Sequence, residues 1–183
     1  MKKKILVACL CVALAVLTIA GTTLAYLTSK TEAVVNTFTV GNIDITLAET
    51  TTTYKMVPGT TIAKDPKVTV EAGSEACWLF VKVEESTNLD DFITYTIDSD
   101  WTALTGVDGV YYREVDAATT DTSFNVLTGN QVTVKNTVTK PMMDAITNGT
   151  TTKPTLSFTA YAIQKAGFDT ATAAWTEVSK STT

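Results

Sequence analysis

The sequence contains no histidine, and this absence excludes most of the common catalytic centres. A Ser-His-Asp triad, a Cys-His dyad and a His-Glu-x-x-His zinc site all need an imidazole as base or ligand. No glycine-rich phosphate-binding loop occurs in the chain either. Paired carboxylates are therefore the catalytic chemistry that the composition leaves open.

Two acidic clusters could supply such a pair, Asp90-Asp91 and Asp98-Ser99-Asp100. They could serve as the acid and base of a glycosidase or as calcium ligands. Neither cluster has the Asp-x-Asp-x-Asp-Gly spacing of a calcium loop, and both fall where strands are expected to end and solvated acids are common. We predict no catalytic residue, no metal site, no cofactor and no enzymatic activity, with a glycosidase and a calcium site as the alternatives.

Cysteine is also scarce, and two of the three, Cys9 and Cys11, lie in the first 25 residues. The third, Cys77, stands among apolar neighbours and has no partner for an intrachain disulfide once those residues are removed. We interpret it as a small buried hydrophobic residue. Stability must then come from packing and hydrogen bonds.

The N-terminus has the order of a secretory signal peptide. Lys2–Lys4 give a positive start, Ile5–Ala20 are apolar or small apart from Thr18, and Thr23 and Ala25 are small residues at positions −3 and −1 of a cleavage site. We predict a signal peptide over residues 1–25, cleaved between Ala25 and Tyr26. The protein would then be secreted, to the extracellular matrix or the cell surface.

Two alternatives to cleavage exist. The 21 residues from Ile5 to Ala25 are long enough for a retained membrane anchor, although Gly21-Thr22-Thr23 weakens the apolar stretch at its end. Leu6-Val7-Ala8-Cys9 looks like a lipoprotein motif, but too few apolar residues precede Cys9. Cleavage is the favoured interpretation.

Cleavage shortens the chain from 183 to 158 residues, and the loss of three lysines changes its net charge from −5 to −8. An acidic surface argues against nucleic acid and anionic lipid as partners. Roughly one residue in five is threonine, and β-branched residues favour strands.

Alternating apolar residues predict an antiparallel β-sandwich of about eight strands over residues 37–183, with one or two short helices. Cys77–Val83 is apolar on both faces, which is typical of a central strand. Residues 91–98 are expected to form another strand. Pro141 and Gly149 bound one expected helix, and Asp169 is expected to cap a second.

Three stretches resemble the TasA/camelysin family, whose members use a dedicated SipW-type signal peptidase. The first is the small-residue cleavage site with an aromatic residue after it. The second is the stretch Asn36-Thr37-Phe38-Thr39-Val40-Gly41-Asn42-Ile43-Asp44-Ile45. The third and weaker one runs from Val57-Pro58-Gly59 to Asp65-Pro66, where the family has a Pro-Gly turn followed by Lys-Asp. Some family members were described as metallopeptidases, an activity that we do not extend to a chain without histidine.

The resemblance implies a jelly-roll-like sandwich that assembles with itself into biofilm-matrix or surface fibres by donor-strand complementation. Residues 26–36 would be the donor segment, with Tyr26, Leu27, Val34 and Val35 in the groove of the next subunit. Signal peptidase would be a partner during export, and the membrane would not be one after cleavage. Two alternatives are a frayed N-terminus and a monomeric secreted or surface adhesin.

The secreted protein should begin at Tyr26, because Ala25 is the last small residue before an aromatic. N-terminal sequencing of the secreted material measures this directly. A chain that begins at Met1, or that carries an acyl group on Cys9, would contradict the prediction.

Overall fold

The computed structural model describes residues 41–182, and its ten strands in this range form three antiparallel sheets. This confirms the prediction of an all-β sandwich, with ten strands in place of about eight. The strands are β1 Ile45–Ala48, β2 Thr61–Ala63, β3 Lys67–Val70, β4 Cys77–Glu85, β5 Ile93–Thr94, β6 Thr102–Ala103, β7 Val110–Val115, β8 Thr122–Asn125, β9 Gln131–Val134 and β10 Leu156–Gln164.

The helices of the described part are more numerous than the expected one or two. They are α2 Leu89–Phe92, α3 Lys140–Thr147, α4 Ala171–Val178 and the 3₁₀ helices η1 Thr128–Asn130 and η2 Ser179–Thr182. None of the helices within residues 41–182 is long and apolar enough to cross a membrane. The predicted signal peptide 1–25 and donor segment 26–36 lie outside the described residues, and so do Ala25, Tyr26, Leu27, Val34 and Val35.

Two local predictions were wrong. Residues 91–98 do not form one strand, because α2 occupies Leu89–Phe92 and β5 covers only Ile93–Thr94. The cap of α4 is Thr170 and not Asp169, since the Thr170 hydroxyl accepts a hydrogen bond from the Ala173 N–H at 3.2 Å. The helix bounded by Pro141 and Gly149 is confirmed as α3.

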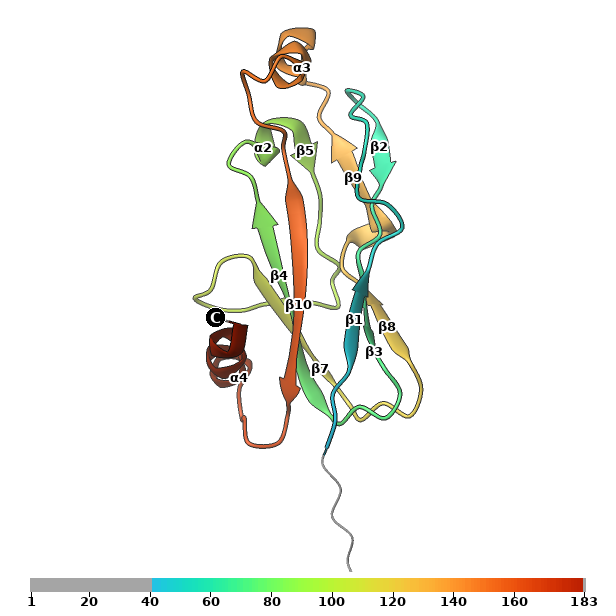
Figure 1. Ribbon diagram of the computed structural model, residues 1–183, viewed down its shortest axis with the longest axis vertical. Coiled ribbons are helices and arrows are strands. Elements are labelled where there is room, and N and C mark those ends of the chain that lie inside the picture. Colours follow the sequence, from blue (N-terminus) through green and yellow to red (C-terminus); the bar gives the residue numbers. More distant parts are fainter. Residues whose placement is uncertain (1–40, 183) are drawn as a thin grey trace, which may run out of the picture. The chain divides into compact units, whose positions relative to one another are not determined.

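The sandwich has a continuous layer and an interrupted one (Figure 1). The continuous layer is the sheet β10-β4-β7-β6, and the other layer consists of β1-β3-β8 and β2-β9-β5. Its interruption lies at Lys64–Pro66, between β2 and β3. The Lys64 N–H still donates to the Asn130 carbonyl and the Val126 N–H to the Pro66 carbonyl, both at 2.9 Å. The two small sheets therefore follow one another along the same layer.

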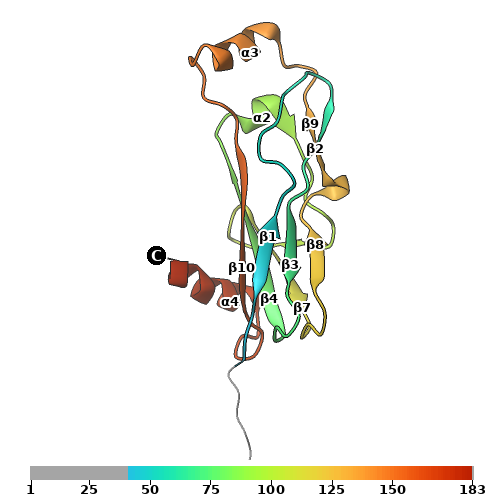
Figure 2. The same ribbon diagram turned by 45° about the vertical axis from the view of Figure 1, so that its right-hand side comes forward.

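Strand β4 joins the hydrophobic clusters on the two faces of its sheet. Leu79 and Val81 are fully buried against Val68 and Val70 of the opposite layer. Trp78 and Phe80 point the other way, into a cluster with Ala171 and Ala174 of α4, which covers that face (Figure 2). The prediction of a central strand that is apolar on both faces is confirmed.

Replacement of Leu79 by alanine should lower the free energy of unfolding by about 2–5 kcal/mol, because it leaves a cavity in a close-packed interior. Leu47→Ala is the matched control: Leu47 is 37% exposed, so its truncation should cost less than about 1 kcal/mol. Urea unfolding of both variants measures the difference. Equal losses would mean that β4 is not the centre of the core.

Candidate functional site

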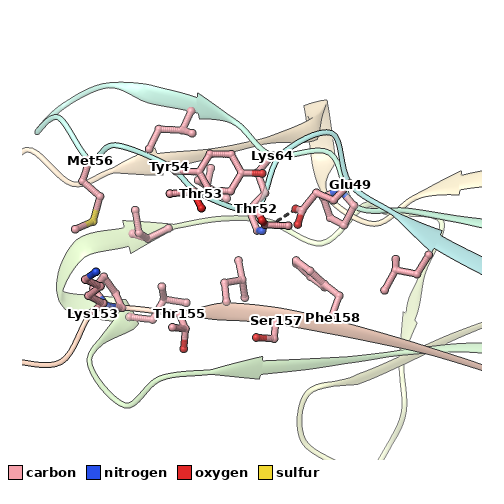
Figure 3. A pocket seen from close by; sticks show the side chains of 18 of the residues that line it. Glu49, Thr52, Thr53, Tyr54, Met56, Lys64, Lys153, Thr155, Ser157 and Phe158 are labelled. Atoms are coloured by element: carbon pink, nitrogen blue, oxygen red, sulfur yellow. Dashed lines mark hydrogen bonds and ion pairs between the residues drawn. The ribbon is translucent and has the colours of Figure 1, made fainter.

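A groove of about 830 Å³ opens at one edge of the sandwich, between residues 47–56 and the start of β10 (Figure 3). Its volume is in the range of ligand-binding clefts. Most of its lining is apolar and comes from both layers, including Met56, Ile62, Leu89, Ile93, Leu156 and Phe158. The hydrophobic interior is thus accessible from outside along this edge.

Hydrogen bonds to Asp65 hold one wall of the groove in place. The Thr50 N–H donates to Asp65 Oδ1 at 2.9 Å, and the Thr50 hydroxyl donates to the other carboxylate oxygen. These bonds hold the pKa of Asp65 below its usual value. Residues 47–56 are thereby tied to the point where the second layer is interrupted.

A buried ion pair reinforces the same wall. Lys64 Nζ lies 2.7 Å from Glu49 Oε1, and the two side chains are only 8% and 17% exposed. The ammonium group also lies 5.1 Å from the ring centroid of Tyr54 and 5.3 Å from that of Phe158, within the range of cation–π attraction. Lys64 thus connects three segments of the groove: residues 47–56, the end of β2, and β10 (Figure 3).

Tyr54 contributes a neutral ring to this arrangement. Burial, together with the negative charges of Glu49 and Asp65, raises its pKa to about 12. Its hydroxyl donates a hydrogen bond to the Thr51 carbonyl. The phenol therefore stays protonated at neutral pH, and it shapes the groove without supplying a nucleophile.

Strand β10 borders the groove with an unpaired edge. It is the outermost strand of its sheet, and no strand within residues 41–182 pairs with its other side. Along β10, Thr155 accepts a hydrogen bond from Ser86 and Lys165 donates one to Ala76. Because alternate residues of an antiparallel strand bond to the same neighbour, the backbone groups of Leu156 and Phe158 point away from β4. These groups are free to pair with an added strand.

The acidic clusters have ordinary structural surroundings. Asp90 Oδ1 lies 3.9 Å from Lys135 Nζ, and Asp100 Oδ2 lies 4.0 Å from Arg113 Nη1. Asp98 Oδ1 accepts a hydrogen bond from the Asp100 N–H at 3.1 Å. Nowhere in the described part of the chain do three histidine, cysteine or acidic side chains come together in a way that could hold a metal ion.

Cys77 is fully buried, and burial raises the pKa of its thiol to about 11. It is therefore protonated at neutral pH. Its position in the core confirms the interpretation as a small hydrophobic residue.

Sequence reasoning did not find the groove. The residues that it assigned to assembly lie outside the described part, and it did not single out Glu49 or Tyr54. The one signal was the Lys-Asp pair of the family pattern, which corresponds to Lys64-Asp65 and which the structure places at the groove wall.

Fold and site together define a β-sandwich with an open edge beside an apolar groove. The family model of the camelysin metallo-endopeptidases matches residues 1–93, and the chain belongs to this family. The resemblance to the TasA/camelysin family is thereby confirmed. No curated protein and no solved structure matches the chain.

The family description names a metal-dependent peptidase, but the described residues of this chain offer no group of side chains suited to a metal ion. The sequence has no histidine. No hydrolytic step can be derived from this arrangement. The absence of enzymatic activity stays a prediction.

Glu49→Gln should destabilise the protein by about 3 kcal/mol, because it leaves the buried ammonium of Lys64 without a countercharge. Glu84→Gln is the control: Glu84 pairs with Lys82 at 2.7 Å, but the two side chains are 56% and 38% exposed, and such pairs contribute at most about 1 kcal/mol. Urea unfolding of both variants provides the comparison. Equal effects would show that the Lys64–Glu49 pair is not held out of solvent.

Proposed function

We propose that this chain is an exported structural subunit that assembles into an extracellular fibre, of the biofilm matrix or the cell surface, by donor-strand complementation. The observation that carries the proposal is the unpaired edge of β10 beside the apolar groove. An added strand would cover the exposed interior and pair with the free backbone groups of Leu156 and Phe158.

The physical basis is that an open sheet edge is a template for another strand. Strand addition is stabilised by main-chain hydrogen bonds, while alternate side chains of the added strand enter pockets. The groove offers both features, since the free backbone groups of β10 lie beside Ile62, Leu89 and Ile93. In the monomer, Leu89 and Ile93 are buried, whereas Ile62, Leu156 and Phe158 stay only half-buried along the groove.

The donor would be residues 26–35 of another copy, released at their N-terminal end when signal peptidase cuts after Ala25. Ten residues in extended conformation span about 33 Å, which exceeds the length of residues 153–158, the segment that borders the groove and ends in the first three residues of β10. The segment is long enough for this role.

Contacts of β1 limit the part of β10 to which a strand can be added. The chain reaches β1 through Asn42 and Asp44, whose carbonyls accept hydrogen bonds from Glu75 and Glu71. Cα atoms of β1 then lie within 8 Å of β10, whereas a strand between the two would need roughly 9.6 Å, twice the usual interstrand spacing. No added strand can therefore lie between β1 and the part of β10 that β1 contacts.

The charge expected after cleavage suits this role. A net charge of −8 follows from the loss of three lysines, and strong like charge keeps subunits dispersed until a specific contact forms. A monomeric adhesin is the alternative, and the state of assembly of the secreted protein separates the two.

Deletion of residues 26–35 should give a folded, monomeric protein that forms no filaments, because the donor is lost while the sandwich is kept. Negative-stain microscopy, circular dichroism and size-exclusion chromatography of the secreted variant and of the unaltered chain measure this. Filaments from the deletion variant would contradict donor-strand assembly. An unfolded variant would also contradict it, because the segment would then belong to the core of its own subunit.

A further inference from the structure

We infer that the donor strand enters the groove in one phase only: the side chains that face the interior come from Leu27, Ser29, Thr31, Ala33 and Val35, and Lys30 and Glu32 face solvent. This inference rests on the proposed function and specifies which face of the segment is recognised by the second copy. It follows from the one-sidedness of the groove and from the charge pattern of the segment.

The groove has one apolar side because successive side chains at the start of β10 alternate between the interior and solvent. Leu156 and Phe158 pack against the interior clusters, whereas Ser157 between them is exposed. A strand added to this edge continues the pleat, so every second side chain points to the interior and the others point out. A shift by one residue would exchange the two sets completely.

The segment itself distinguishes the two phases. Its odd-numbered residues are aliphatic, small or hydroxyl-bearing, and none of them is charged. The even-numbered face would carry Lys30 and Glu32 into the groove, where the ammonium of Lys64 and the carboxylate of Glu49 are already paired with each other. Charged groups that leave water without compensation are costly to bury, so the odd phase is favoured.

The four residues that were expected in the groove fall into two sets, one that faces the interior and one that faces solvent. Leu27 and Val35 share the inward phase, whereas Tyr26 and Val34 fall on the outward one. Val34 and Val35 have the same side chain and adjacent positions, and they are therefore a matched pair for an experiment. Both lie far enough from Ala25 to leave the cleavage site intact.

The test is lysine substitution in the full chain, exported by its own signal and examined by negative-stain microscopy. Val35→Lys should abolish filaments, because it places a charge against the apolar side chains that line the groove. Val34→Lys should leave the amount of filaments at the level of the unaltered chain. Ala33→Lys repeats the inward test at a second position. Each variant adds the same charge, and circular dichroism checks that all three remain folded.

Other outcomes overturn the inference in distinguishable ways. Loss of filaments with Val34→Lys alone would assign the even phase, and loss with both valine variants would mean that both faces are buried. In both cases the segment would still be needed for assembly, and the proposed function would stand. If all three lysine variants form filaments and the deletion of residues 26–35 does so as well, the segment is not the donor and the proposed function fails too.

Discussion

The strand β4 is the constraint on which the rest of this structure depends. Its residues Trp78 to Val81 are almost completely excluded from solvent, so each face needs an apolar cover and each edge a neighbouring strand. The interrupted layer covers one face and α4 the other, while β7 and β10 pair with its two edges. Pairing of β10 along its whole length with β4 leaves the outer side of β10 as the boundary of the sheet.

The groove is a consequence of that boundary and of the interruption in the opposite layer. At Lys64–Pro66 the second layer changes from one sheet to the next, and residues 47–56 are held there by Asp65 and Lys64. Buried ion pairs contribute little net stability, since desolvation offsets the attraction. We suggest that this pair serves to hold residues 47–56 in place as the wall of the groove opposite β10.

The sequence was sufficient for the elements whose signal is local. The two-sided apolar pattern of β4 and the Pro141 and Gly149 boundaries of α3 both predicted what the structure shows. The short helix α2 was missed, because four residues are too few to establish a helical period. The groove could not be predicted, since it depends on which strand lies at the edge, and it joins Glu49 and Lys64 to Phe158, more than 90 residues further along the chain.

The central claim is that the outer edge of β10 is free in the monomer and paired in the assembly. Residue-resolved hydrogen exchange of the Leu156 and Phe158 amides tests it most directly, with the Ser157 amide, which points towards β4, as the internal reference. The account predicts rapid exchange at positions 156 and 158 in the monomer, strong protection in filaments, and slow exchange at 157 in both. Exchange at 156 and 158 that is equally fast in monomer and filament would contradict it.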